Sequence, residues 1–387
     1  MADKVRVVCI VGTRPEAIKM APVVRDLRAR SGFEVFLLST GQHREMLAQV
    51  LAAFELKPDY DLEIMTERQS LNGILARALP GLDQVYQEIQ PDLVLTQGDT
   101  STAFIAGLVA FNRRITVAHV EAGLRSFDKW QPFPEEVNRR LLSVVADFNF
   151  APTTTARNYL LQEKVAESAI FVTGNTVTDA LLTMLKPGYQ FRNAALAQKV
   201  AGLARGQRLI LVTAHRRENW GKPLRQICQA IKELLASGLP VRFIWPVHLN
   251  PTVRNLVHQE LDGVAGVFLT DPLEYPDLAN LISQVDLIWT DSGGIQEEAP
   301  TLGKPILVLR EVTERPEGVA AGTASLVGTD VAQLVAQTQL LLTNETSYQQ
   351  MATAYNPYGD GQAAWRIGEY LSWYYGLTST KPEPFGK

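Results

Sequence analysis

The stretch VRVVCIVGTRPEAIKMAPVVRDLRAR (residues 5–30) decides the fold. Its first seven residues form a nearly continuous apolar run, which is typical of a strand that helices cover on both faces. Residues 17–30 then predict a helix. The loop between them places Pro15 where a first helical turn accepts proline, and it brings Arg14 and Lys19 close to the end of the strand. A strand, a charged loop and a helix in this order predict one unit of a parallel α/β sheet.

The same alternation continues along the chain. Further strands are expected at Val35–Ser39, Leu93–Gln97, Ile115–Val120, Phe148–Phe150 and Ile170–Thr173, and a second series at Leu209–Thr213, Val241–Trp245, Val267–Leu269, Leu287–Thr290 and Ile306–Leu309. Helical patterns separate them, for example at Leu71–Gln90, Thr102–Phe111 and Glu135–Val145. This alternation predicts two doubly wound, Rossmann-like α/β domains that face a central cleft.

The domain boundary is expected where the strand pattern stops. Residues 184–207 contain no strand pattern, so we expect a first domain over 1–184, a linker over 185–207 and a second domain over 208–355. The remaining residues, 356–387, predict a helical tail that packs on the first domain. Most of the candidate acid–base residues described below lie in the first domain.

Composition excludes several classes of protein. The chain has 387 residues, 46% of them hydrophobic, which is enough for a core in each of two domains. Its net charge of −4 argues against nucleic-acid binding. Cys9 and Cys228 cannot build a disulfide framework, and the five histidines are too scattered for a metal cage. With no 18-residue apolar run and no signal-peptide pattern, we expect a cytoplasmic protein without a membrane span.

Ionisable residues follow several of the strands. Asp99, Glu121 and His215 stand directly after apolar runs, and Glu135 stands at an expected helix start. Alone, Asp99 could be a helix cap and Glu135 a partner of the helix dipole. Because ligands bind outside the carboxyl ends of parallel strands, their joint placement predicts a site for proton transfer instead.

A second group of residues suits phosphate. Ser292, Gly293 and Gly294 join a strand to a helix, with Glu298 a little over one turn later, and Arg315 follows the next strand. Small residues at a helix start let backbone N–H groups approach an anion, and arginine matches phosphate geometry. The alternatives are a tight turn and a surface salt bridge to a neighbouring glutamate. Neither the GxGxxG nor the GxxxxGK[ST] fingerprint is present at the first loop.

Taken together, these residues belong to a series of longer motifs. They are GTRPEAIKMAPV (12–23), GQHREML (41–47), QGDTSTAF (97–104), HVEAGLRS (119–126), PFPEEVNRR (132–140), GNTVTDAL (174–181), TAHRREN (213–219), PVHLNP (246–251), TDSGGIQEEAPTLGKP (290–305), TERPE (313–317) and NPYGDGQA (356–363). In this order, and over almost the whole chain, they resemble the non-hydrolysing UDP-N-acetylglucosamine 2-epimerases.

The resemblance implies a fold, an activity and a set of site residues. The fold would be glycosyltransferase-B-like, with a UDP-binding second domain, and the protein would be a homodimer without a cofactor or metal. The activity would be interconversion of UDP-GlcNAc and UDP-ManNAc, by elimination of UDP to a 2-acetamidoglucal and its re-addition. The family's catalytic positions fall on Asp99, Glu121, Glu135 and His215, and its substrate-binding positions on Arg14, Lys19, Arg139, Ser292, Gly293, Gly294, Glu298 and Arg315.

The chain departs from the family pattern in two places. Relatives that bind a second, activating UDP-GlcNAc do so at positions matching Gln42, His43 and Arg68, but Glu45 replaces a glutamine that some of them carry. Gln97 replaces a histidine common before the Gly-Asp pair, which changes a hydrogen bond. Three alternatives stay open beside the epimerase: a hydrolysing relative, a glycosyltransferase of the same fold, and a nucleotide-sugar sensor without catalysis.

Overall fold

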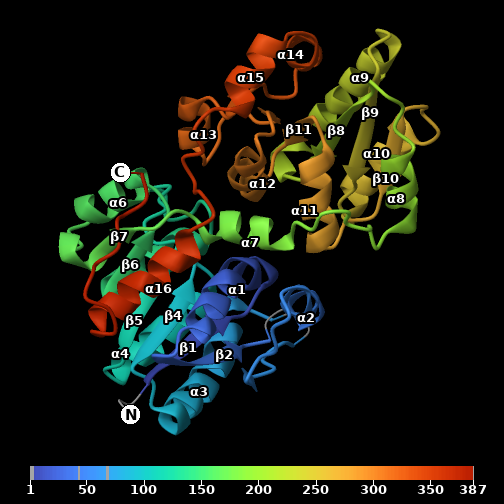
Figure 1. The fold of residues 1–387 in the computed structure, drawn as a ribbon. Coiled ribbons are helices and arrows are strands. Elements are labelled where there is room, and N and C mark those ends of the chain that lie inside the picture. Colours follow the sequence, from blue (N-terminus) through green and yellow to red (C-terminus); the bar gives the residue numbers. More distant parts are fainter. Residues whose placement is uncertain (1–3, 42–43, 67–68, 387) are drawn as a thin grey trace. The chain divides into compact units, whose positions relative to one another are not determined.

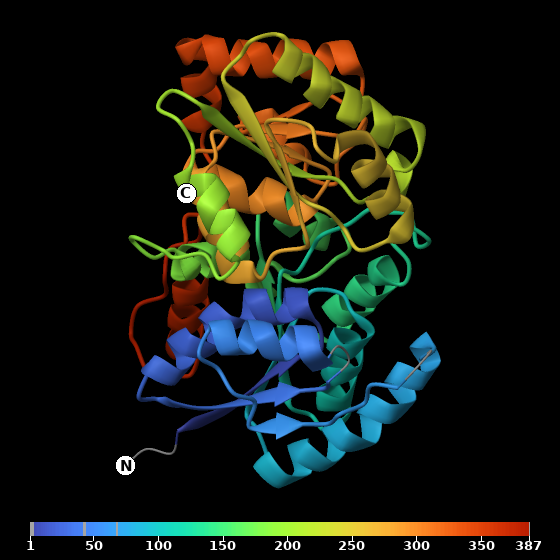
Figure 2. The ribbon, with the colours of Figure 1, turned by 90° about the vertical axis from the view of Figure 1, so that its right-hand side faces the viewer.

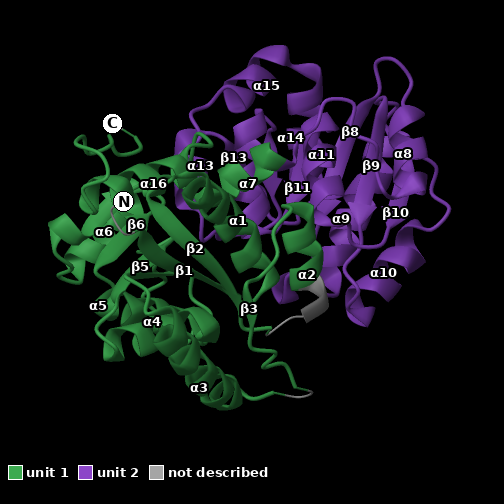
Figure 3. Cartoon of the chain, turned by 60° about the horizontal axis from the view of Figure 1, so that its bottom comes forward, with its two compact units in different colours: residues 1–183, 358–387 green, residues 184–357 purple. Residues whose placement is uncertain are grey.

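The structure, a computed structural model, describes residues 4–41, 44–66 and 69–386 and contains two compact units. The first comprises residues 1–183 and 358–387, and the second comprises residues 184–357 (Figure 3). The chain therefore leaves the first unit once and returns to it for its last thirty or so residues.

The described part of the first unit contains one parallel sheet of seven strands, in the order β3-β2-β1-β4-β5-β6-β7. The strands are β1 (Val5–Val11), β2 (Phe33–Ser39), β3 (Tyr60–Asp61), β4 (Leu93–Gln97), β5 (Thr116–Val120), β6 (Phe148–Ala151) and β7 (Ile170–Val172). The order reverses between β1 and β4, as in a doubly wound nucleotide-binding sheet. Crevices for ligands form at such a reversal, so the loops after β1 and β4 are expected to border a ligand site.

Helices cover both faces of this sheet. They are α1 (Arg14–Ala29), α2 (Arg44–Ala53), α3 (Leu71–Ile89), α4 (Ser101–Asn112), α5 (Glu135–Val145), α6 (Thr154–Gln162), α7 (Thr176–Met184) and α16 (Ala363–Tyr374). Figure 2 shows α1 and α3 on opposite faces of β1 and β2. The α3 face is held by a buried apolar cluster that includes Ile10, Ile74 and Leu82. The strands are apolar on both sides because both sides are covered.

The C-terminal helix α16 belongs to the first unit and lies alongside α1 (Figure 1). Its Tyr370 ring packs against the rings of Phe148, Phe150 and Phe171 on β6 and β7, with centroids 4.7 to 5.8 Å apart. Aromatic contacts of this kind add to the free energy gained by burying the rings. They fix the returning chain on the far half of the sheet.

The second unit repeats the design. Its six described strands pair in parallel in the order β10-β9-β8-β11-β12-β13, the same order as the first six strands of the first sheet. They are β8 (Arg208–Thr213), β9 (Val241–Pro246), β10 (Val267–Thr270), β11 (Leu287–Thr290), β12 (Ile306–Val308) and β13 (Ala324–Leu326). Here the order reverses between β8 and β11. Two doubly wound α/β domains, as expected from the alternation of strands and helices, are confirmed.

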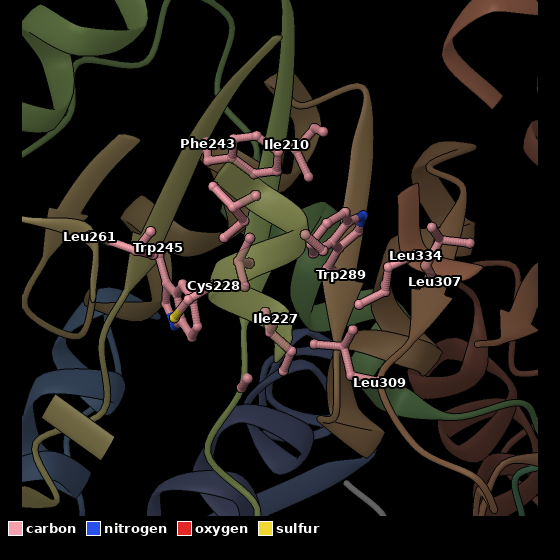
Figure 4. Close-up of a cluster of buried hydrophobic side chains, with 14 of the residues drawn as sticks. Ile210, Ile227, Cys228, Phe243, Trp245, Leu261, Trp289, Leu307, Leu309 and Leu334 are labelled. Carbon is pink, nitrogen blue, oxygen red and sulfur yellow. The ribbon is translucent and has the colours of Figure 1, made fainter. Parts of the chain in front are cut away.

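Helices also cover the second sheet, and a large apolar core lies between them and the sheet. The helices are α8 (Ala194–Ala201), α9 (Lys222–Ala236), α10 (Pro251–Leu261), α11 (Tyr275–Gln284), α12 (Gly293–Glu298), α13 (Pro316–Ala321), α14 (Val331–Thr343) and α15 (Glu345–Ala352). Figure 4 shows Trp245, Trp289 and Cys228, which lies on α9, among the buried side chains of one core cluster. Both cysteines are free and buried, and burial raises the pKa of each thiol to about 12.

The range 185–207, expected as a linker, lies in the second unit and contains α8. Leu196 on α8 is fully buried in the core of that unit, with Phe191 and Val200 packed beside it. Residues without a strand pattern can still carry a packed helix, which is why the strand pattern alone did not reveal it. None of the described helices is long and apolar enough to cross a membrane.

Candidate active site

The loops after β1, β4 and β5 meet at one edge of the first sheet, because these strands are neighbours in it. A buried carboxylate, Glu16, organises the first of these loops. It accepts hydrogen bonds from the amides of Gly12 and Thr13 at 2.9 and 2.7 Å and from the hydroxyl of Thr100, after β4, at 2.5 Å. Glu16 is 2% exposed, and burial raises its pKa. The loop is therefore tied to its neighbour, and α1 begins with Arg14 directly after it.

Glu121 stands at the end of β5 in an unusual backbone conformation. Its φ angle is +66°, a left-handed value that non-glycine residues rarely adopt and that is common at functional sites. Its side chain is 6% exposed. Lys19 Nζ forms an ion pair with Oε1, Asn175 Nδ2 donates to the same oxygen at 3.0 Å, and Gln97 Nε2 donates to Oε2. Three nitrogen donors thus fix the direction of both oxygens.

Asp99 lies next to this group. Burial raises the pKa of its carboxyl, and the charges of Glu121 and Glu135 raise it further, while Arg139 and Lys19 lower it. Arg139 Nη2 is 3.1 Å from Asp99 Oδ2. The structure therefore brings all three candidate carboxylates and two cations into one cluster. A buried carboxyl group with a raised pKa, set among other ionisable side chains, is a candidate for proton transfer.

The alternative role of Asp99 as a helix cap is wrong, because Thr100 is the N-cap of α4 and accepts a hydrogen bond from the Ala103 amide. Glu135 is the first residue of α5, as expected from its place at a predicted helix start. Asn138 Nδ2, one turn later on α5, donates to the Asp99 carbonyl at 2.9 Å. This hydrogen bond from α5 fixes the turn that carries Asp99.

His119 supports the same turn from β5. Its Nε2 lies 2.7 Å from the Gly98 carbonyl oxygen, and its side chain is fully buried. Burial lowers the pKa of the imidazole to about 4, so it is neutral at pH 7. A neutral ring that faces a carbonyl must donate from Nε2, which fixes its tautomer. His119 is therefore a structural donor rather than a proton carrier.

In the second unit, the loops after β8 and β11 are neighbours for the same topological reason. His215 follows β8 and Asp291 follows β11, and His215 Nδ1 is 3.1 Å from Asp291 Oδ1. The other oxygen of Asp291 accepts the amides of His215 and Arg216 at 2.8 and 2.9 Å. The His215 ring also stacks on His248, with centroids 5.5 Å apart. One face of His215 is thereby covered while its side chain stays 38% exposed.

The residues expected to bind phosphate lie at the same edge of the second sheet. Ser292 is the N-cap of α12 and Gly293 its first residue, and Arg315 lies over that turn. A Cβ added at Gly293 would lie 3.7 Å from Arg315 Nη2, so the guanidinium and the glycine backbone are in contact range. Arg315 Nε pairs with Glu297, and Arg315 Nη1 donates to the backbone carbonyl of its neighbour Glu314 at 3.1 Å. Glu298, which is 5% exposed, accepts a hydrogen bond from the hydroxyl of Tyr275 at 2.8 Å.

Some predicted positions cannot be placed. Gln42, His43 and Arg68, expected to hold a second nucleotide sugar, lie outside the described residues. Across the described ranges, no group of three or more His, Cys, Asp or Glu side chains is arranged to hold a metal ion.

Four residues in these clusters were assigned no function by the sequence analysis. Glu16, His119 and Asn175 in the first unit, and Asp291 in the second, each contact a candidate residue or its loop. Asp291 and His119 do stand beside strand ends, so their positions were a usable signal. Asn175 follows β7, two strands away from β5, and only the strand order and side-chain reach connect it to Glu121.

Comparisons with known proteins point to one family. A family profile described as UDP-N-acetylglucosamine 2-epimerase matches residues 25–372. A UDP-N-acetylglucosamine 2-epimerase of Bacillus subtilis is 47% identical over 382 residues, which cover 99% of both chains. The crystal structure of the Neisseria meningitidis UDP-GlcNAc 2-epimerase bound to UDP-GlcNAc is 44% identical, with a TM-score of 0.84 and coverage of 95% of this chain and 99% of that one.

A more distant solved structure matches over the same extent. The Methanocaldococcus jannaschii UDP-GlcNAc 2-epimerase, in complex with UDP-GlcNAc and UDP, is 32% identical with a TM-score of 0.76, and the match covers 95% of this chain and 99% of that one. Family profile, sequence relatives and solved structures thus agree along nearly the full length. The chain belongs to the UDP-N-acetylglucosamine 2-epimerase family of isomerases.

Proposed function

We propose that this protein interconverts UDP-GlcNAc and UDP-ManNAc by eliminating UDP to a 2-acetamidoglucal and adding it back. The observation that carries the proposal is the cluster of Asp99, Glu121 and Glu135 with Lys19 and Arg139 at one sheet edge. A protein that only binds an anionic sugar nucleotide gains nothing from three carboxylates, because they repel the diphosphate. Proton transfer requires such groups.

The chemistry explains why two acid–base groups are needed. The C2 proton of the sugar has no adjacent carbonyl to activate it, so its removal is coupled to loss of UDP from C1. A base takes the proton, the C1–O bond breaks with its electron pair leaving on UDP, and a C1–C2 double bond forms. UDP then attacks C1 again while C2 receives a proton on the opposite face. One group serves each face, and the raised pKa of Asp99 favours it as a proton donor.

The residues of the second unit suit the leaving group. The Ser292–Gly294 turn and Arg315 would hold the diphosphate, and Glu298 would accept hydrogen bonds from ribose hydroxyls. Donors that are already in place where charge develops stabilise the departing UDP without reorganisation. His215, oriented by Asp291, would act on a phosphate oxygen or on the sugar. The solved relatives with bound UDP-GlcNAc and UDP support this class of ligand.

We further propose, from the family resemblance, that the enzyme is a cytoplasmic homodimer whose product supplies ManNAc units for a cell-surface polysaccharide. No cofactor is required, because the elimination and the addition conserve the oxidation state of the sugar overall.

Incubation of the protein with UDP-GlcNAc in D2O, followed by NMR of the sugar, tests the proposal. The expected result is deuterium at C2 in a mixture of UDP-GlcNAc and UDP-ManNAc. Net release of free ManNAc would identify a hydrolysing enzyme instead. Turnover that starts only after an acceptor is added would identify a glycosyltransferase, and binding without any change in the sugar would identify a sensor.

A further inference from the structure

The carboxylate of Glu121 accepts a hydrogen bond from a residue that does not belong to the strands next to β5. Of the three nitrogen donors described above, Lys19 lies on α1 and Gln97 ends β4, beside β5. The third, Asn175, follows β7 at the edge of the sheet and is 2% exposed. A buried carboxylate with several N–H donors cannot rotate without losing a hydrogen bond.

The side chain of Asn175 has two tasks that can be separated. Its Oδ1 accepts the amide of Val177 at 3.1 Å, at the start of α7, and its Nδ2 donates to Glu121 Oε1 at 3.0 Å. One partner offers only a proton and the other only lone pairs, so the amide has a single orientation that satisfies both. The first bond stabilises a helix end. The second acts on Glu121.

The returning C-terminal chain holds Asn175 in place. The Asn175 amide donates to the carbonyl of Tyr358 at 2.6 Å, and Arg366 Nη1 donates to the carbonyl of Thr173 at 3.2 Å. On the other side of Asn175, Asp179 accepts the amides of Ala363 and Ala364 at the start of α16, at 3.2 and 2.8 Å. Residues 173–179 are therefore fixed at three points by residues 358–366, which lie more than 180 positions later in the sequence.

We propose that Asn175 is a positioning residue for Glu121, and that the C-terminal segment 358–366 is part of the support of the active site. The inference rests on the proposed function, in which Glu121 takes part in proton transfer at C2. Asn175 touches no substrate atom in this assignment. It keeps Oε1 of Glu121 aimed in one direction, so its loss is expected to lower kcat more than it changes KM.

Substitution of the side chain tests the proposal, since serine and aspartate both cap helices about as well as asparagine. Asn175→Ser keeps the cap but loses the donor to Glu121. Asn175→Asp also keeps the cap but places an oxygen against Oε1. If Asn175 positions Glu121, kcat is expected to fall by at least about tenfold in the serine variant and further in the aspartate variant. KM is expected to change less than about threefold. A role in capping alone predicts near-wild-type kcat in both and a loss only in Asn175→Ala.

Each rate is measured well below the melting temperature of the variant, so that unfolded enzyme cannot account for a loss. Asn344→Ser is the matched control, because Asn344 caps α15 through its Oδ1 and the Ser347 amide on an exposed helix of the second unit. Its kcat is expected to equal that of the wild type. Wild-type kcat in Asn175→Ser and Asn175→Asp would overturn the positioning role. If the wild-type protein itself failed to exchange the C2 proton in the same assay, the proposed function would fail, and this inference with it.

Discussion

The imidazole of His215 and the carboxylate of Asp291 stand 3.1 Å apart at the ends of two neighbouring strands of the second sheet. Burial alone would raise the pKa of Asp291, but the His215 side chain and the Arg216 amide together hold it below the usual range. The carboxylate is fully buried and its second oxygen binds two backbone amides. It is therefore a fixed negative charge beside the His215 ring, and it favours one orientation of that ring.

Asp291→Asn is expected to lower kcat by about 100-fold, a loss within the range for general acid–base catalysis, because the amide keeps the shape but removes that charge. The steady-state rate of UDP-GlcNAc epimerisation measures the effect. Asp262→Asn is the matched control, since Asp262 forms a similar pair with His258, at 2.8 Å, on an exposed part of the second unit. Equal rates for the Asp291 variant and this control would remove Asp291 from the mechanism.

Asp99→Asn is expected to keep the fold and to lose at least about 100-fold in C2 proton exchange, because an amide can neither give up nor take up a proton as a carboxyl group does. Deuterium uptake from D2O reports this step directly. Asp83→Asn, which removes an exposed partner of Arg113 in the same unit, serves as the control and is expected to exchange normally. Exchange at the normal rate in Asp99→Asn would refute a catalytic role for this carboxyl.

Position after a strand was enough to select the candidate site residues, but not the side chains that hold them in place. Asp99, Glu121 and His215 were predictable because a side chain directly after a buried parallel strand must emerge at the edge of the sheet. The contact between Asn175 and Glu121 was not, because it needs the order of β5, β6 and β7 and the length of two side chains. The contact of Asn175 with Tyr358 joins residues 183 positions apart, and no local pattern encodes it.

Arg315→Lys is expected to raise KM for UDP-GlcNAc by about tenfold with a smaller effect on kcat, because lysine replaces a two-pronged donor with a point charge. The dissociation constant of UDP, measured by calorimetry, gives the same comparison without turnover. Arg192→Lys is the control, since Arg192 forms an exposed pair with Glu274 in the same unit, at 2.5 Å. Unchanged UDP affinity in Arg315→Lys would show that Arg315 does not bind the diphosphate.

Asp179 holds the C-terminal segment, and its titration is expected to make the stability of the protein depend on pH. Burial raises the pKa of this carboxyl from 3.8 to about 6, despite the amides of Ala364 and Ala363 that bind it. Because the folded-state pKa lies above the unfolded one, the free energy of unfolding that this group contributes is fully present at low pH. It is lost as the pH rises through about 6.

Between pH 5 and pH 7.5, this loss amounts to about 1.4 kcal/mol for a pKa that rises by about two units. Asp179→Asn removes the titration, so the wild type is expected to lose about that much stability relative to the variant over this interval. Denaturant unfolding of both proteins at the two pH values, followed by tryptophan fluorescence, measures the difference. Asp330→Asn, at the exposed cap of α14, is expected to show no such change. A constant difference between wild type and Asp179→Asn at both pH values would mean that Asp179 does not titrate in this range.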